Sequence, residues 1–513
     1  MKRLLLTLAV CGSCLAAIAQ PAVAPKRELR AAWIATVANI DWPSREAVGH
    51  SVRQQQELCA MLDTLQALHM NAVVFQIRPT ADAFYYSELE PLSHWLTGAQ
   101  GRDNDVSYDP LAFAVREAHK RLLDVHVWLN PYRVTNSKNA VLDSLHIMRQ
   151  HPEWFVCYGD KWYFDPGRDE TRRWLNSVVA DIVSRYDVDA VHFDDYFYPY
   201  RIPKKEFPDS ASFADFPRGY TDKDAWRRHN VDMVIEELQH TIKSLKPWVE
   251  FGISPFGVWR NRSADPERGS LTQAGCQNYD DLYADILLWL ERGWIDYVAP
   301  QLYWEIGKRV ADYEVLARWW AQYAYGRNLY IGHAPYQLGN RRGAEAWRQP
   351  NEICRQIALN RTIEGIEGSV YFSMQSLMAN RQGLCDSLRN CYYRYPALPP
   401  VCRNIEGPKA SMPQNARMEG HLLSWECGDA ATAQDNTKPA EGITTQIKAE
   451  ASAFYVVYGF PIGSEPDFDN PAYIIGRTRD TRFELDEPDR YETVCITAVN
   501  RYKQESLPCI LPR

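Results

Sequence analysis

The sequence predicts an α/β protein: a (β/α)8 or TIM barrel over residues 28–395, followed by a small all-β sandwich over residues 402–513. Three observations predict this. Strand-like and helix-like segments alternate along the first part of the chain, several of the strands carry polar side chains at every second position, and the helical periodicity stops near residue 400. Alternating strands and helices indicate parallel pairing, because each helix returns the chain to the start of the next strand.

Eight segments have the length and composition of barrel strands. Each is short, rich in β-branched or aromatic residues, and followed by a loop that contains Pro, Asn or Asp. We expect these strands at residues 32–37, 72–78, 124–130, 190–195, 250–254, 297–304, 329–333 and 368–373.

Helical segments lie between these strands, with apolar residues at three- and four-residue spacing. We expect them at residues 53–69, 110–121, 170–185, 226–245, 279–292, 313–323 and 351–362. An open doubly wound sheet is the competing architecture. No G-x-G-x-x-G sequence follows the first strand, so the closed barrel is the better prediction.

Polar side chains distinguish these strands from ordinary buried ones. Parallel barrel strands are covered on both faces and are usually almost entirely apolar. Four of the expected strands instead alternate with period two, which places a polar or aromatic face toward the barrel interior. Polar groups at the carboxyl ends of barrel strands are typical of a ligand site, because those ends open into the cleft.

The carboxyl groups at two strand ends are the candidate catalytic residues. Glycoside hydrolysis uses one carboxyl group as proton donor and a second that attacks the sugar or activates water. We expect Asp194, after the fourth strand, to be the attacking or activating carboxylate, and Glu305, after the sixth, to be the general acid/base. Asp195 is the third candidate, because repulsion between neighbouring carboxylates raises the pKa of one of them.

Two alternatives for these acids stay open. The Asp194–Asp195 pair also suits a loop cap or a divalent cation site. Glu305 also suits a simple salt bridge to Arg78 or Arg133. The polar and aromatic residues at the same strand ends are candidates for substrate binding: Arg78, Asn130, Arg133, Trp128, His192, Tyr196, Gln301, Tyr303 and Trp304.

Composition and net charge restrict the kinds of partner that we expect for this chain. The chain has 513 residues, a formal net charge of −8 and no run of five or more basic residues, so nucleic acid is an unexpected partner. After the first residues no segment reaches about 18 continuous apolar residues, so we expect no membrane span. The cysteines show no C-x-x-C or zinc spacing, so a metal site built on cysteine is not indicated. We expect no metal and no cofactor. We also expect a monomer, with the cysteines either free or paired as disulfides.

The first 19 residues have the pattern of a signal peptide. A basic start is followed by an apolar stretch and then by Ala17-Ile18-Ala19, an A-x-A cleavage sequence. We therefore expect an exported protein in the periplasm, the cell envelope or the medium. Lipid attachment at Cys11 or Cys14 is the less favoured alternative, since cleavage at either would shorten the apolar region.

The tail after residue 400 contains short strands broken by turn residues. We expect strands at 422–425, 454–459, 473–477 and 493–500. This part of the chain resembles fibronectin type III modules, particularly through Tyr491 and the CITAVN sequence at 495–500. A structural role is favoured over glycan binding, because no exposed aromatic set is evident.

The strand-end motifs of the barrel resemble the bacterial glycosyl-hydrolase-like family 10. The matching segments are RAAWIATV (30–37), NIDWP (39–43), QIRP (76–79), DAFY (82–85), NPYR (130–133), HFDDYFYP (192–199), GISPFG (252–257) and PQLYW (300–304). The resemblance implies an exported barrel hydrolase that cuts a polysaccharide, with the glycan strands of peptidoglycan as the associated substrate. Two other functions remain open: a non-catalytic glycan-binding envelope protein on a barrel scaffold, and a cation-dependent carbohydrate enzyme.

Overall fold

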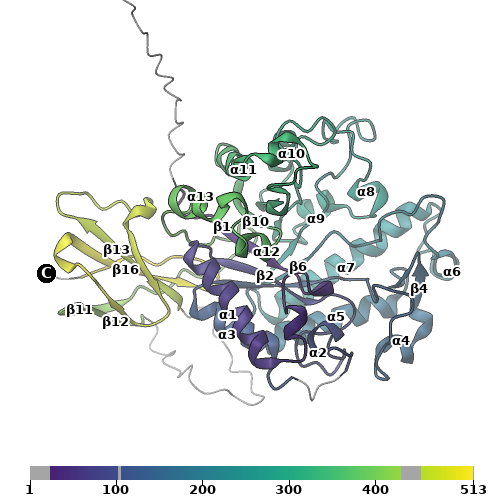
Figure 1. Ribbon diagram of the computed structural model, residues 1–513, viewed down its shortest axis with the longest axis horizontal. Coiled ribbons are helices and arrows are strands. Elements are labelled where there is room, and N and C mark those ends of the chain that lie inside the picture. Colours follow the sequence, from purple (N-terminus) through teal and green to yellow (C-terminus); the bar gives the residue numbers. More distant parts are fainter. Residues whose placement is uncertain (1–23, 102–105, 429–451, 512–513) are drawn as a thin grey trace, which may run out of the picture.

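The computed structural model describes residues 24–101, 106–428 and 452–511 (Figure 1). The expected signal peptide at residues 1–19, with Cys11 and Cys14, lies outside the described residues. The barrel and the sandwich follow each other along the long axis of the molecule, with the sandwich at the end where the chain finishes (Figure 1).

Eight parallel strands close into a barrel in the order β1-β10-β9-β8-β7-β6-β3-β2, which confirms the predicted fold class. Each strand pairs in parallel with its two neighbours, and β1 joins β10 to close the ring. The strands are β1 (Leu29–Ile34), β2 (Ala72–Arg78), β3 (Asp124–Leu129), β6 (Ala190–Phe193), β7 (Glu250–Ile253), β8 (Tyr297–Val298), β9 (Asn328–His333) and β10 (Ile366–Tyr371).

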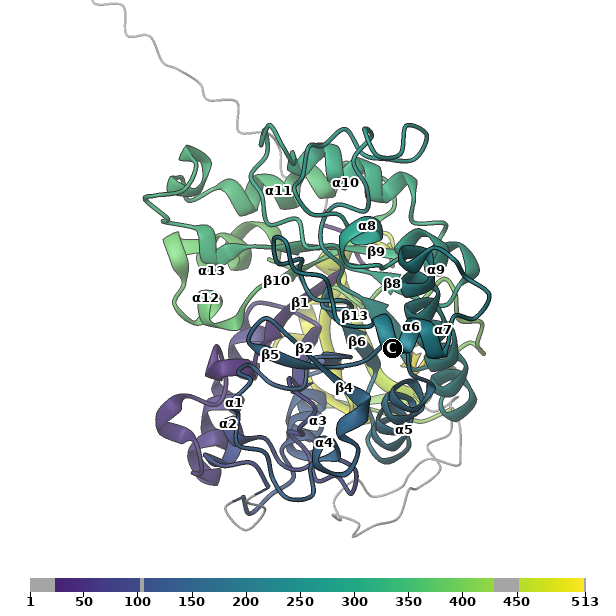
Figure 2. The same cartoon turned by 90° about the vertical axis from the view of Figure 1, so that its right-hand side faces the viewer.

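Helices surround the barrel, as the view along its axis shows (Figure 2). The longer ones are α1 (Ser51–Ala67), α3 (Pro110–Lys120), α5 (Asp169–Arg185), α7 (Lys223–Leu245), α10 (Tyr313–Gln322) and α11 (Glu352–Asn360). Shorter ones are α2 (His94–Thr97), α4 (Ile147–Gln150), α6 (Ser210–Asp215), α8 (Asn278–Asp281), α9 (Ile286–Arg292), α12 (Met374–Met378) and α13 (Leu384–Ser387). Asp109, Asp222 and Asp312 cap the helices α3, α7 and α10 through backbone N–H groups.

Two expected elements are interrupted. The strand predicted over 297–304 forms a continuous ladder only over β8, residues 297–298, because Pro300 has no N–H to donate. Beyond Pro300 the chain makes only isolated bridges at Gln301. The helix predicted over 279–292 divides into α8 and α9, because Tyr283 has a φ of 54° and Asp285 caps a new helix through the N–H of Leu288.

An unpredicted hairpin stands in the loop between β3 and α5. Its strands β4 (Phe155–Tyr158) and β5 (Lys161–Phe164) pair antiparallel. A bridge between Arg133 and Tyr163 attaches the hairpin to the segment that follows β3. The hairpin therefore stands on the side of the barrel where its strands end.

Two apolar layers hold the barrel. Outward side chains of the strands, such as Val127 and Val191, pack with the helices in one large cluster. Inward side chains, including Trp33, Tyr297 and Tyr330, fill the interior. The barrel is therefore a packed core, and ligand chemistry is restricted to its rim.

The tail forms two antiparallel sheets, which confirms the small all-β sandwich. One sheet contains β11 (Gln414–Glu419), β12 (Leu422–Glu426) and β15 (Arg482–Glu484), and the other contains β14 (Ile474–Thr478), β13 (Ser452–Pro461), β16 (Tyr491–Asn500) and β17 (Cys509–Ile510). Side chains of both sheets, among them Leu423, Val457 and Ile496, share one buried cluster. Burial of this shared face makes the two sheets one unit.

Within the described ranges, no helix is long and apolar enough to cross a membrane. The cysteines of the same ranges form no disulfide. Of the two alternatives, free thiols or disulfides, the structure therefore has free thiols in these ranges. No group of three or more His, Cys, Asp or Glu side chains in those residues is arranged to hold a metal ion.

Charged contacts join the sandwich to the face of the barrel where the strands begin. Lys503 forms an ion pair with Glu250, the first residue of β7, and lies 3.3 Å from a carboxylate oxygen of Asp124, the first residue of β3. Arg501 lies 2.6 Å from a carboxylate oxygen of Asp187. The sandwich is seen behind the barrel in the axial view (Figure 2). Acids that the barrel buries are thus neutralised by cations of the tail.

We expect Lys503→Met to lower the free energy of unfolding by about 3–5 kcal/mol, because it leaves the buried Glu250 without its cation. Denaturant unfolding of the full chain measures this, with Lys409→Met, an exposed lysine of the same tail, as the control. Glu250→Gln in the Lys503→Met chain should recover part of the loss. A loss no larger than that of the control would mean that the sandwich contributes little to barrel stability.

Candidate active site

Asp194 lies directly after β6 and accepts hydrogen bonds on both carboxylate oxygens. Trp128 Nε1 donates to Oδ2 at 2.9 Å, and Asn130 Nδ2 lies 3.1 Å from Oδ1 and 3.3 Å from Oδ2. The backbone N–H of Tyr196 donates to Oδ1 at 3.2 Å. Trp128 pairs in register with His192, so the parallel pairing of β3 with β6 carries the donors beside the carboxylate. Such donors favour the ionised form of Asp194.

Asp195 has different partners, which come from the loops of the rim. The hydroxyl of Tyr200 donates to its Oδ2, and Gln301 Nε2 donates to its Oδ1 at 3.2 Å. Gln301 also donates to the backbone oxygen of Ser254 at 3.0 Å, which holds its amide in place. Neighbouring carboxyl groups are therefore held by separate sets of donors.

Burial raises the pKa of both carboxyl groups. For Asp195 the charge of Asp194 adds to the effect of burial, and the pKa is raised to about 6. For Asp194 the effect of burial is opposed by the nearby charge of Arg133 and by the hydrogen bond from Trp128. We infer that Asp194 ionises first and that Asp195 holds the proton of the pair into the weakly acid range.

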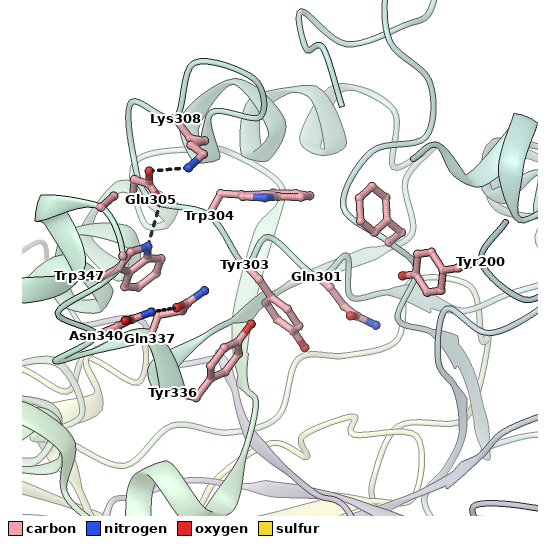
Figure 3. Close-up of a pocket in the computed structure, with 13 residues that line it drawn as sticks. Tyr200, Gln301, Tyr303, Trp304, Glu305, Lys308, Tyr336, Gln337, Asn340 and Trp347 are labelled. Atoms are coloured by element: carbon pink, nitrogen blue, oxygen red, sulfur yellow. Dashed lines mark hydrogen bonds and ion pairs between the residues drawn. The ribbon is translucent and has the colours of Figure 1, made fainter. Parts of the chain in front are cut away.

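A pocket of about 380 Å³ opens beside the two side chains that bind Asp195. Tyr200 and Gln301, which bind Asp195, lie at one end of it, and Glu305 and Lys308 lie at the other (Figure 3). Aromatic rings and amides form most of the lining. The lining residues are Tyr200, Phe256, Gln301, Tyr303, Trp304, Glu305, Lys308, Tyr336, Gln337, Asn340, Gly343, Ala344 and Trp347. Apolar faces with a few fixed polar groups suit a sugar ring.

Glu305 is placed differently from the prediction. It was expected at the end of a continuous sixth strand, but β8 ends at Val298 and Glu305 lies in the loop beyond it. Its Oε2 accepts the indole N–H of Trp347 at 2.9 Å, and its Oε1 lies 3.3 Å from Lys308 Nζ. The cation paired with Glu305 is therefore Lys308, and not Arg78 or Arg133, the partners of the alternative considered above. Glu305 lines the pocket, and its acid/base role stays a prediction.

Two of the residues expected to bind substrate are buried among other protein groups. Arg78 is fully buried and donates to both oxygens of Glu90, at 2.7 and 2.6 Å, and to the backbone oxygen of Asn130. Both ring nitrogens of His192 have partners. Nδ1 lies 2.9 Å from the hydroxyl of Tyr297, and Nε2 accepts the indole N–H of Trp33. Burial lowers the pKa of His192 to about 3, so the ring is neutral. Arg78 and His192 therefore bond to other protein groups beneath the rim, and neither lines the pocket.

The other predicted residues gather at the rim. Trp128, expected as a substrate-binding residue, is 6% exposed and donates its indole N–H to Asp194. The Arg133 guanidinium lies 5.1 Å from the ring centroid of Tyr196. Tyr303 and Trp304 line the pocket, with Trp304 edge-to-face on Phe256.

The sequence analysis missed the residues that loops bring to the site. Tyr200 reaches Asp195 from the loop after β6, Trp347 reaches Glu305 from the loop after β9, and Tyr163 comes from the unpredicted hairpin. Loop residues follow no period, so strand and helix patterns do not detect them. The aromatic run from Tyr196 to Tyr200 was the available signal.

A buried carboxyl pair at the carboxyl end of a (β/α)8 barrel, beside an aromatic pocket, is an arrangement that suits glycoside hydrolysis. Comparison with protein families supports this class: the Glycosyl hydrolase-like 10 model matches residues 28–348. The chain belongs to that family, as its motifs indicated.

Two relatives match most of the chain. Glycosyl hydrolase YngK of Bacillus subtilis (strain 168) is 47% identical over 407 residues, which cover 77% of this chain and 79% of that protein. Glycosyl hydrolase DigH of Escherichia coli (strain K12) is 41% identical over 366 residues, which cover 67% of this chain and 82% of that protein. Among solved structures, the PgaB (BpsB) glycoside hydrolase domain of Bordetella bronchiseptica matches with a TM-score of 0.46 and 11% identity, covering 72% of this chain and 99% of that one.

We expect Trp128→Phe to lower kcat by about tenfold or more, because it removes one hydrogen bond to a charged carboxylate. Without that donor the pKa of Asp194 should rise, so the acidic limb of the kcat profile should move to higher pH. Turnover measured across pH tests this. Trp162→Phe is the control, since its indole donates to a backbone oxygen of Lys138. An unchanged profile in Trp128→Phe would mean that ionisation of Asp194 does not limit turnover.

Proposed function

We propose that the chain hydrolyses O-glycosidic bonds of a polysaccharide, with Asp195 as the proton donor and Asp194 as the charged partner. The observation that carries the proposal is the unequal environment of two adjacent buried carboxyl groups. Asp194 accepts N–H donors on both oxygens, whereas the pKa of Asp195 is raised to about 6 by burial and by the charge of Asp194. An acid of this pKa can give up a proton near neutral pH.

The different environments of Asp194 and Asp195 suit them to different roles in the reaction. Asp195 would protonate the oxygen of the leaving sugar as the glycosidic bond breaks. The bond-breaking state carries positive charge at the anomeric carbon, and the fixed charge of Asp194 stabilises it. A water molecule would then add to the anomeric carbon, and the proton that it loses would return to Asp195. Trp128 and Asn130 keep Asp194 oriented, so no reorganisation is needed when the charge develops.

Glu305 remains the second candidate for the acid. It lines the same pocket, but it is ion-paired with Lys308 and lies at the end away from Tyr200 (Figure 3). We favour Asp195, because no such cation is paired with it among the described residues. The donors on both oxygens of Asp194 also favour hydrolysis over a cation-dependent reaction, since they occupy the lone pairs that a metal would need.

We propose the glycan strands of peptidoglycan as the substrate, as the family resemblance implies. The pocket supports a sugar that carries an acetamido group, because Gln301, Gln337 and Asn340 place amides beside the rings of Tyr303 and Trp304. Amides can hydrogen-bond the acetamido oxygen and nitrogen, and rings pack against the apolar faces of sugars.

We also propose that the chain is exported and acts as a monomer. The basis for export is the signal-like sequence at residues 1–19, which ends at an A-x-A site. The tail is proposed as a fibronectin type III-like spacer, since its three-strand and four-strand sheets follow the order expected of such modules.

Two matched variants identify the proton donor. Asp195→Asn should lower hydrolysis of a natural glycan by about 10²- to 10⁴-fold and largely spare an aryl glycoside, whose good leaving group needs little protonation. Glu305→Gln should affect both substrates alike. In the wild type, activity should fall as pH rises above about 6, because Asp195 loses its proton. The reverse pattern of the two variants would assign the acid to Glu305 and contradict our assignment.

Release of reducing ends from purified peptidoglycan glycan strands tests the reaction and the substrate together. We expect wild-type protein to release them, and Asp194→Asn to release about 10³-fold fewer or none, because the charge that stabilises the bond-breaking state is gone. A chelator should not change the wild-type rate. Binding without release would favour a non-catalytic glycan-binding protein, and loss of activity in chelator would favour the cation-dependent enzyme.

A further inference from the structure

Two cations lie together on the hairpin side of the carboxyl pair. Arg133, just after β3, forms an antiparallel bridge with Tyr163 of β5. The backbone N–H of Val134 donates to the oxygen of Trp162 at 2.9 Å, which fixes this pairing. Side chains two residues apart on a strand share a face, so Lys161 lies on the same face as Tyr163 and Arg133. The hairpin therefore brings Lys161 to the rim of the site.

The guanidinium of Arg133 has donors to spare. Its Nε donates to the backbone oxygen of Pro79 at 3.2 Å, and it lies over the ring of Tyr196. Its two terminal nitrogens donate to no group of the described chain and are reached by solvent, although Arg133 as a whole is only 7% exposed. They are therefore available to a ligand at the rim. Its charge also acts on Asp194, where it opposes the effect of burial on the pKa.

Lys161 is half-buried and, among the residues with described positions, has neither a hydrogen bond nor an ion pair from its ammonium group. Burial lowers the pKa of Lys161, the charge of Arg133 lowers it further, and the charge of Asp160 opposes both to a smaller extent. Two neighbouring cations repel each other, and partial burial increases the cost of holding them together. An anion bound between them would remove the repulsion and supply the missing partners.

We propose that Lys161 and Arg133 form a carboxylate-binding subsite beside Asp194, and that the glycan carries a carboxyl group on the sugar next to the bond that is cut. The proposal rests on the hydrolase function and specifies its substrate class as an acidic glycan. A carboxylate fits better than a phosphate, because the subsite adjoins the charge of Asp194, and a doubly charged group would be repelled more strongly. A planar carboxylate also matches the two terminal nitrogens of arginine.

Binding of defined oligosaccharides to the full chain tests the subsite. The Asp195→Asn background keeps bound glycan from being cut during calorimetry. Three ligands separate the sources of the carboxylate: an oligomer of alternating N-acetylglucosamine and N-acetylmuramic acid, the same oligomer with its carboxyl groups reduced to alcohols, and an oligomer of alternating N-acetylglucosamine and glucuronic acid. We expect one of the two acidic oligomers to bind at least about tenfold more tightly than the reduced one.

Variants of Lys161 then assign that preference to the subsite. Lys161→Gln should reduce the preference to about twofold or less, whereas Lys161→Arg should keep most of it, because the charge remains. Lys120→Gln, on the outer side of α3, is the matched control and should leave the preference unchanged. Thermal unfolding of each variant checks that the fold is intact.

The proposal is overturned if the protein binds acidic and reduced oligomers equally, binds neither, or keeps its preference in Lys161→Gln. Hydrolysis is measured separately, by release of reducing ends from the same oligomers with wild-type protein. A Lys161-dependent preference without cleavage would keep the subsite and reject the hydrolase function. Cleavage without that preference would keep the hydrolase and reject the subsite.

Discussion

Closure of the barrel is the constraint on which the site depends. When β1 pairs with β10, eight parallel strands place all their carboxyl ends on one rim. The interior is filled by side chains such as Tyr297 and Tyr330, so no ligand can enter below that rim. Residues that follow different strands, such as Asn130 after β3 and Asp194 after β6, then meet within hydrogen-bonding distance although they are far apart in the chain.

The unequal treatment of two identical side chains follows from this geometry. Asp194 faces strand β3 and receives N–H donors from Trp128 and Asn130, which compensate for its burial. Asp195 turns to the loops, where Tyr200 and Gln301 bind it beside the pocket. A charged neighbour and burial both disfavour a second negative charge, so one carboxyl group keeps its proton into the weakly acid range.

The two ends of the barrel differ in how their charged side chains are paired. At the end where the strands begin, Glu250 and Asp187 are paired with Lys503 and Arg501 of the sandwich, and these pairs join the tail to the barrel. At the rim where the strands end, Arg133 and Lys161 form no ion pair with any residue of the described chain. Unsatisfied charge costs stability, and functional sites are where proteins commonly carry that cost. The rim also has a pocket beside the side chains that bind Asp195, and for this reason we regard the rim, and not the tail interface, as the place of chemistry.

The sequence by itself determined the order of strands and helices, the all-β tail, and the positions of Asp194 and Asp195 after a strand, because these follow from local periodicity and chain order. The strand predicted to carry Glu305 ends early, because Pro300 has no N–H to continue the ladder, so Glu305 lies in the loop beyond β8. Only the tertiary structure decided which groups hold each carboxylate, because the donor Trp128 is 66 positions from Asp194 and Gln301 is 106 from Asp195. Contacts over such separations depend on barrel closure and loop packing, which leave no periodic pattern in the sequence.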